Sequence, residues 1–168
     1  MNKIDLGQAI TILANFGVLI GILLLVFELN QNRVVTEAQT RSAITASIID
    51  LSEMITQSPM GMTIYEKRLD KEPLTVREIY WQRGASRAVF RHWENVYFQY
   101  RAGLFNEQEL DTYRVYWRNV TRCRTWQQDF WADTKMQFNP HFREEMDSIL
   151  GESGDCQLPV GPAAEQVR

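Results

Sequence analysis

The chain opens with a long apolar run and then changes to a mixture of apolar and charged positions. No charged residue occurs between Leu6 and Phe27. As a helix, these roughly 22 residues would rise about 33 Å, which is enough to cross the hydrocarbon core of a bilayer. The pattern therefore predicts a transmembrane helix over residues 6–28, preceded by a short N-terminus at residues 1–5.

A cleavable signal peptide is the main alternative for this segment. Such a peptide has a basic start, a shorter apolar stretch and a cleavage site flanked by small residues. Here Lys3 is offset by Asp5, and the run ends in Phe27-Glu28-Leu29-Asn30. We therefore expect an uncleaved anchor. Basic residues are nearly balanced on its two sides, and a short, almost neutral N-terminus is easily translocated, so we expect the C-terminal domain to face the cytoplasm.

The pattern after the apolar run predicts further helices. The absence of Gly and Pro between Gly21 and Pro59 allows the first helix to continue through residues 29–57. Later helices are expected to start at Ser58-Pro59, Thr75-x-x-Glu78, Asn106-x-x-Glu109 and Asn139-Pro140, and Gly103 is expected to end one. These signals predict a soluble helical domain over residues 58–150, followed by a disordered tail at residues 151–168.

Large apolar residues recur at helical spacing in each of these segments. The expected buried faces comprise Ile79, Phe90, Trp93, Tyr97, Tyr100 and Leu104; Leu110, Tyr113, Trp117 and Val120; Trp126, Phe130 and Trp131; and Phe142, Met146 and Leu150. No segment shows a convincing strand pattern. The predicted fold class is all-α, with a long N-terminal membrane helix that continues into a soluble helical bundle.

The membrane helix has two faces that differ from plain lipid-facing surface. One face carries the small residues Gly7, Ala14, Gly17 and Gly21, and Gly17-x-x-x-Gly21 has the spacing that lets two helix backbones approach closely. The other carries Gln8, Thr11 and Asn15, whose polar groups favour another helix or water over lipid. Glu28 follows at the expected exit from the bilayer. A lone helix cannot satisfy these groups, so we expect a homo-oligomer.

Two series of arginines follow helical spacing in the soluble part. Arg83, Arg87 and Arg91 form the first, and Arg114, Arg118 and Arg122 form the second. If the two series meet, they predict a site for an anion or a lipid headgroup. The alternative is ordinary pairing with nearby acids, because Glu94 and Asp111 lie three residues from Arg91 and Arg114.

Composition narrows the classes of function. The net charge of −3 argues against a general nucleic-acid binder. Cys123 and Cys156 could form one bridge in an oxidising compartment, but a pair of ordinary thiols is the preferred interpretation. His92 and His141 are the only histidines, and His92 and Glu94 point to different sides of a helix, so no metal site is expected. No nucleophile–base motif or Gly-rich phosphate loop is present, and we expect neither a cofactor nor enzymatic activity.

Three segments carry a resemblance to known proteins. They are Leu29-Asn30-Gln31-Asn32-Arg33, the arginine- and aromatic-rich run from Phe90 to Arg101 with Gly103-Leu104, and Phe138-Asn139-Pro140-His141-Phe142. Over most of residues 8–150, the chain resembles a loose group of uncharacterised bacterial membrane proteins with one N-terminal transmembrane helix. The resemblance implies a bacterial inner-membrane protein and no particular activity.

These patterns lead to two expectations of function. The first is a non-catalytic, single-pass homo-oligomer, bound to membrane lipid, whose helices act as a scaffold or interaction module. The alternative is an oligomeric ion channel, with Gln8, Thr11, Asn15 or Glu28 lining a path between the first helices.

Overall fold

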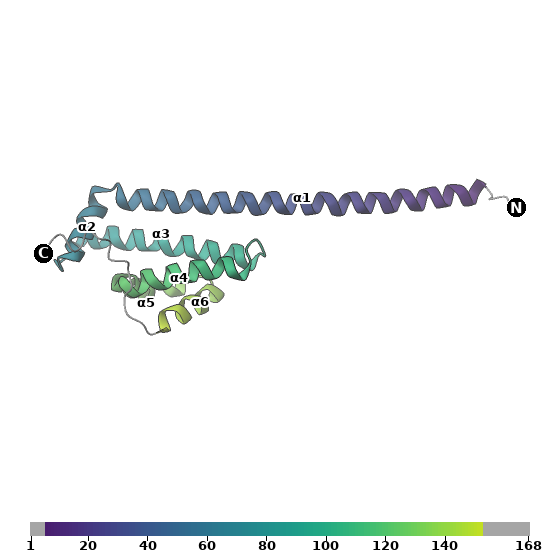
Figure 1. Ribbon diagram of the computed structural model, residues 1–168. Coiled ribbons are helices and arrows are strands. Elements are labelled where there is room, and N and C mark those ends of the chain that lie inside the picture. The colour runs from purple at the N-terminus through teal and green to yellow at the C-terminus, as the bar shows by residue number, and fades with distance from the viewer. Residues whose placement is uncertain (1–5, 153–168) are drawn as a thin grey trace. The chain divides into compact units, whose positions relative to one another are not determined.

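The computed structural model describes residues 6–152 of the chain. The expected N-terminus at residues 1–5 and most of the expected tail, residues 153–168, lie outside the described residues. The chain divides into two units, Met1–Arg41 and Ser42–Arg168. Helix α1 (Leu6–Thr56) begins in the first unit, and its last residues belong to the second. This helix confirms the predicted continuation beyond the apolar run (Figure 1).

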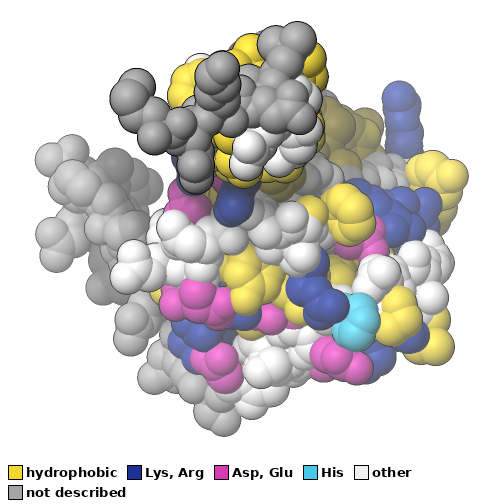
Figure 2. Space-filling view, turned by 90° about the vertical axis from the view of Figure 1, so that its right-hand side faces the viewer, with side chains coloured by type: hydrophobic (Ala, Val, Ile, Leu, Met, Phe, Trp, Pro, Cys, Tyr) yellow, Lys and Arg dark blue, Asp and Glu magenta, His cyan; other side chains and the backbone are white. Residues whose placement is uncertain are grey.

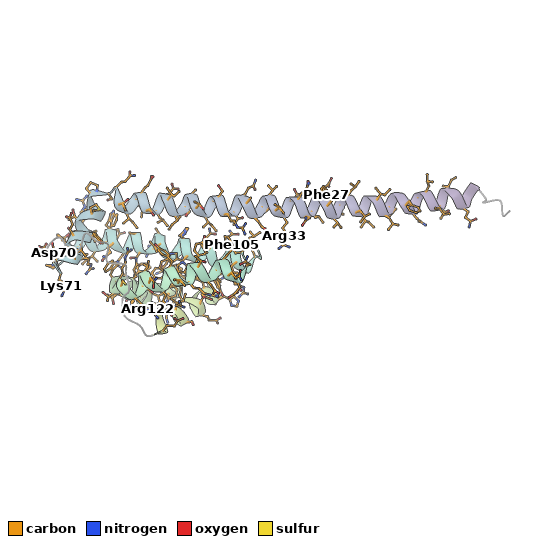
Figure 3. The ribbon with its side chains drawn as sticks, viewed as in Figure 1. Phe27, Arg33, Asp70, Lys71, Phe105 and Arg122 are labelled. Atoms are coloured by element: carbon orange, nitrogen blue, oxygen red, sulfur yellow. The ribbon has the colours of Figure 1, made fainter. Side chains whose placement is uncertain are left out.

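In the first unit, the apolar side chains of α1 face outward. Leu13 is 76% exposed and Leu23 is 69% exposed, and their large apolar neighbours are exposed as well. By length and composition, α1 is a helix that could cross a membrane. Its polar part follows Phe27 and includes Arg33, whose Nε donates a 2.9 Å hydrogen bond to Oε1 of Glu37 (Figure 3).

The second unit is built entirely from helices over its described residues. After the end of α1 come α2 (Pro59–Leu69), α3 (Val76–Arg101), α4 (Glu107–Cys123), α5 (Thr125–Thr134), the single-turn 3-10 helix η1 (Lys135–Gln137) and α6 (Pro140–Gly151). The predicted all-α fold, a long apolar N-terminal helix followed by a packed helical bundle, is confirmed.

Local capping explains where these helices begin. The side chains of Thr75 and Asn106 each accept a hydrogen bond from the backbone N–H three residues later, and the glutamate at that later position bonds back to the cap. Ser58 and Asn139 also cap their helices, each followed by Pro at the first helical position. All four predicted starts are therefore confirmed.

Gly103 ends α3 by adopting a left-handed backbone. Its φ of +76° lies in the region that favours glycine, directly after the helix has stopped at Arg101 and Ala102. This turn leads the chain into α4 (Figure 1).

The core of the second unit is rich in aromatic rings. Phe90 and Trp93 of α3 are buried, and Trp93 stacks on Trp117 of α4 with ring centroids 5.7 Å apart. Phe142 of α6 meets the edge of Trp117 at 6.1 Å. These contacts hold α3, α4 and α6 together through large flat side chains, whose burial supplies much of the hydrophobic stabilisation.

The expected buried face of α3 is only partly correct. Ile79 is 43% exposed, whereas Val96, which the apolar pattern did not include, is fully buried. Ile149 on α6 is likewise buried and was not predicted. Near its start, α3 contacts α2 through the polar side chains of Glu78 and Gln82, which are buried there.

Polar groups fill this interface between α2 and α3. The Nζ of Lys67 lies 2.8 and 3.0 Å from the two carboxylate oxygens of Glu78, and Nη2 of Arg68 donates a 2.6 Å hydrogen bond to Oε1 of Gln82. Further along α3, Nδ1 of His92 is 3.0 Å from Oγ of Ser47 on α1, and burial lowers the pKa of His92. A search for apolar periodicity alone cannot detect these buried polar positions.

Cys123 differs from the expectation of ordinary thiols, because it is disulfide-bonded. The only other cysteine in the chain is Cys156, which lies outside the described residues.

Candidate functional site

The small-residue face of α1 is open in the single chain. A Cβ atom added to Gly7, Gly17 or Gly21 would meet nothing within 4 Å, and Ala14 is exposed. A helix-packing face needs this open space, because a second helix backbone can then approach without contacting a large side chain.

Fewer side chains on the polar face of α1 need an external hydrogen-bond partner than the sequence suggests. The hydroxyl of Thr11 donates a 2.9 Å hydrogen bond to the carbonyl of Gly7 in the same helix, so Thr11 needs no external partner. Gln8, Asn15 and Glu28 are exposed, and within residues 6–152 none of them forms a side-chain hydrogen bond. The amides of Gln8 and Asn15 are therefore the groups that an apolar environment would leave unsatisfied.

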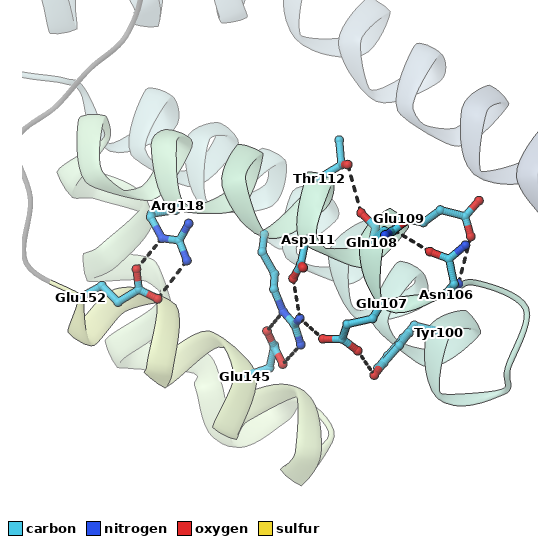
Figure 4. Close-up of polar contacts among 11 residues, drawn as sticks. Tyr100, Asn106, Glu107, Gln108, Glu109, Asp111, Thr112, Arg118, Glu145 and Glu152 are labelled. Carbon is cyan, nitrogen blue, oxygen red and sulfur yellow. Dashed lines mark hydrogen bonds and ion pairs between the residues drawn. The ribbon is translucent and has the colours of Figure 1, made fainter.

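All three arginines of the α4 series form ion pairs with acidic residues. Arg114 donates from Nε and Nη2 to the two carboxylate oxygens of Glu145 on α6, at 2.6 and 3.0 Å (Figure 4). Its Nη1 bonds Asp111 at 2.8 Å and also Glu107. The surrounding carboxylates, Glu145 foremost, raise the pKa of the Arg114 guanidinium. Arg114 therefore acts as a bidentate clasp between α4 and α6.

The other two arginines of this series share one acid. Arg118 donates from Nη2 to Oε1 of Glu152 at 2.9 Å, and Nη2 of Arg122 lies 3.7 Å from Oε2 of the same residue. Figure 4 shows Arg118 of α4 facing Glu152 at the end of α6. Together with Arg114, they join α4 to the last helix through three ion-paired arginines.

Two of the three arginines in the α3 series pair with carboxylates. Arg83 bonds Asp133 of α5 at 2.9 Å, and Arg91 pairs with Glu94 at 2.5 Å. Arg87 is exposed and forms no ion pair with any residue among 6–152. The pairings Arg91–Glu94 and Arg114–Asp111 that the spacing allowed are both present. Among residues 6–152, the structure thus pairs most of these guanidinium groups with carboxylates.

A hollow lies where two of the segments that carry the resemblance meet, the run from Phe90 to Arg101 and the segment Phe138–Phe142. It has a volume of about 510 Å³ and lies between α3 and the start of α6. From α3 it is lined by Arg91, Glu94, Asn95, Tyr97, Phe98 and Arg101, and from the α6 side by Asn139, His141 and Phe142. This volume falls within the range of small-molecule sites.

Hydrogen bonds fix one wall of this hollow. Oε1 of Glu94 accepts from the backbone N–H of Asn139 at 2.7 Å, while its other oxygen is held by Arg91. Arg91 also donates from Nη2 to the carbonyl of Gln137 at 2.9 Å, and its guanidinium lies 4.4 Å from the ring centroid of Phe138. The polar groups of this wall are therefore bound to each other, which makes the wall rigid.

Basic and apolar side chains elsewhere in the lining of the hollow are available to contact a ligand. Arg101 is exposed and forms no ion pair within the described part of the chain, and the neighbouring Phe98 is 63% exposed. His141 is also exposed, with Nδ1 3.7 Å from Oε2 of Glu144. Figure 2 shows a histidine on one face of the molecule among basic, acidic and hydrophobic side chains. This combination can bind an anion that carries an apolar group.

The sequence contains one signal for this hollow, which the spacing of the arginines alone does not reveal. Arg91, Asn95 and Phe98 follow one another at i, i+4 and i+7, which places them along one face of α3. Asn139 and His141 lie more than 40 positions later in the sequence, so the spacing on α3 does not predict that they form the other wall. Across residues 6–152, no group of three or more His, Cys, Asp and Glu side chains is placed to hold a metal ion.

Searches with protein-family models, against curated proteins and against solved structures found no match to this chain.

Proposed function

We propose that this protein is a non-catalytic, single-pass membrane protein that self-associates through the first part of α1. Its helical domain then acts as a membrane-tethered scaffold or interaction module. The observation that carries the proposal is the exposed apolar surface of α1 between Ile10 and Phe27. A continuous apolar surface of this kind is strongly unfavourable in water and favourable in lipid.

Self-association is supported by the open small-residue face of the same helix. Gly17 and Gly21 lie one turn apart with free space around both, so a second α1 can approach there. The amides of Gln8 and Asn15 supply groups that gain from an interhelical hydrogen bond in an apolar environment. The channel alternative is not favoured, because Thr11, one of its few lining groups, is already bonded within α1.

The membrane assignment is tested by fractionating cells that express the full chain. The protein should sediment with membranes and stay there after carbonate or high-salt washes, which remove peripheral proteins. Recovery in the supernatant before any detergent is added would contradict the proposal. Chemical cross-linking of the same membranes should yield a discrete oligomer, and a purely monomeric protein would contradict self-association.

Basic residues are nearly balanced on the two sides of the transmembrane helix and give only a slight preference for a cytoplasmic domain. Cys123 is disulfide-bonded, and disulfides persist in oxidising compartments such as the bacterial periplasm. We therefore propose that the helical domain lies on the oxidising side of the membrane. A maleimide-coupled polymer should label Cys123 only after the protein has been reduced; labelling of the unreduced protein, freshly released from cells, would support the cytoplasmic side instead.

A further inference from the structure

The hollow between α3 and the start of α6 has a charge pattern that differs from the ion-paired surface around it. Its charged lining residues are the basic Arg91 and Arg101 and the acidic Glu94. Arg91 and Glu94 offset each other at 2.5 Å, so Arg101 leaves one uncompensated positive charge at neutral pH. A single such charge in a partly enclosed site favours a monoanion over a more highly charged group.

The start of α6 contributes the imidazole of His141 rather than free backbone donors. The backbone N–H of Asn139 is bonded to Glu94, and that of His141 is bonded to Oδ1 of Asn139. The imidazole of His141 is exposed on the same wall and can donate a hydrogen bond. This donor favours an anionic group, and Arg101 supplies the full charge.

The apolar part of the lining lies beside Arg101 on the same helix. Phe98 precedes Arg101 by three residues, so the two side chains are neighbours on the surface of α3. Most aromatic rings of the bundle lie in its buried core, whereas Phe98 is mostly exposed. Tyr97, half-buried next to it, continues the apolar surface into the hollow. A flat or short-chain apolar group would cover these rings and gain from their removal from water.

We propose that this hollow is a binding site for a small organic carboxylate. Its carboxylate pairs with the Arg101 guanidinium in the bidentate geometry that arginine prefers, and its apolar body lies against Phe98 and Tyr97. The fixed wall formed by Arg91, Glu94 and Asn139 sets the width of the site. Ligand binding here goes beyond the proposed scaffold function and does not depend on it.

Fluorine NMR on the full chain in nanodiscs tests this assignment, with 4-fluorobenzoate as the probe. Its signal should broaden with the protein beyond the effect of empty nanodiscs. Arg101→Gln should weaken binding by about tenfold or more, because it removes the one full positive charge in the hollow that no carboxylate among residues 6–152 offsets. Arg87→Gln is the matched control, since Arg87 is also exposed on α3 and unpaired with any described acid but does not line the hollow. It should leave binding unchanged.

Two further probes determine which chemistry is recognised. Neutral 4-fluorobenzamide, of nearly the same shape, should bind about tenfold more weakly or worse if the carboxylate is the anchor. Tighter binding of 4-fluorophenyl phosphate than of the benzoate would overturn the choice of a carboxylate. Equal losses in Arg101→Gln and Arg87→Gln, equal binding of the amide, or no broadening up to about 10 mM would overturn the site itself. Unchanged tryptophan fluorescence in both variants confirms that each remains folded.

Discussion

The backbone N–H of Asn139 donates a 2.7 Å hydrogen bond to Oε1 of Glu94, although the two residues lie 45 positions apart in the chain. The same carboxylate holds Arg91 with its other oxygen. One glutamate thus joins the middle of α3 to the N-cap of α6. This link brings the arginine- and aromatic-rich segment into contact with the segment Phe138–Phe142, and it forms the rigid wall of the hollow.

Replacement of Glu94 by Gln should therefore loosen the start of α6. The variant loses the charged acceptor for both Asn139 and Arg91, and we expect the free energy of unfolding to fall by about 1–2 kcal/mol. Tryptophan fluorescence is a suitable measurement, because all tryptophans lie between Trp81 and Trp131 in the second unit. Glu144→Gln is the control: its side chain is 80% exposed, and the change should stay within about 0.5 kcal/mol.

Arg114 should contribute more to stability than its neighbour in the series, Arg118. Arg114→Gln leaves the carboxylate of Glu145, only 14% exposed, without its bidentate partner, and we expect a loss of about 2–3 kcal/mol. Arg118→Gln should cost less than about 1 kcal/mol, because its partner Glu152 is 42% exposed. Denaturant unfolding of both variants checks the order. Equal losses would show that the bidentate contact of Arg114 with Glu145 contributes no more than the exposed pair of Arg118 with Glu152.

Gly61 should not tolerate even a methyl group. A Cβ atom there would lie 2.2 Å from the backbone carbonyl oxygen of Ile55, so the turn between α1 and α2 would have to shift. We expect Gly61→Ala to destabilise the domain by about 1–3 kcal/mol. Gly84→Ala is the matched control, because it adds the same methyl group to a helical glycine with nothing within 4 Å. That variant should be unchanged or more stable by up to about 1 kcal/mol.

Glu78 should make the domain sensitive to acid. Hydrogen bonds from Lys67, and then from the backbone N–H of Thr75, lower the pKa of Glu78 from 4.5 to about 2. The unfolded chain therefore binds a proton more readily than the folded one. The stabilisation is fully present above pH 4.5 and is lost as the pH falls from 4.5 toward 2. Glu78→Gln should flatten the stability curve in that interval; an unchanged slope between wild type and variant would contradict this role.

Bulk at the small-residue face of α1 should change self-association. Gly17→Leu or Gly21→Leu places a large side chain where the proposal requires close backbone approach, so cross-linked oligomers should weaken or change in subunit number. Leu23→Phe adds apolar bulk on the opposite side of the helix, about 200° around the axis from Gly21, and should leave the pattern as it is. Identical cross-linking in all variants would mean that the glycine face contacts lipid.

The sequence by itself determined the features that depend on neighbouring residues. Thr75 and Asn106 cap their helices through contacts three positions away, and Gly103 ends α3 through its own backbone freedom. The uninterrupted apolar run up to Phe27 belongs to the same class, since its length and composition alone make α1 long and apolar enough to span a bilayer. Interactions within one turn of helix can be read from spacing.

Only the tertiary structure decided which polar residues are buried and which groups meet. Glu78 and Gln82 occupy inward positions because Lys67 and Arg68 approach from α2, while Ile79 beside them is left outside. The hollow likewise required Asn139 to reach Glu94 across 45 positions. Such pairings depend on how whole helices pack, and a charged side chain carries no mark in the sequence of the distant partner that satisfies it.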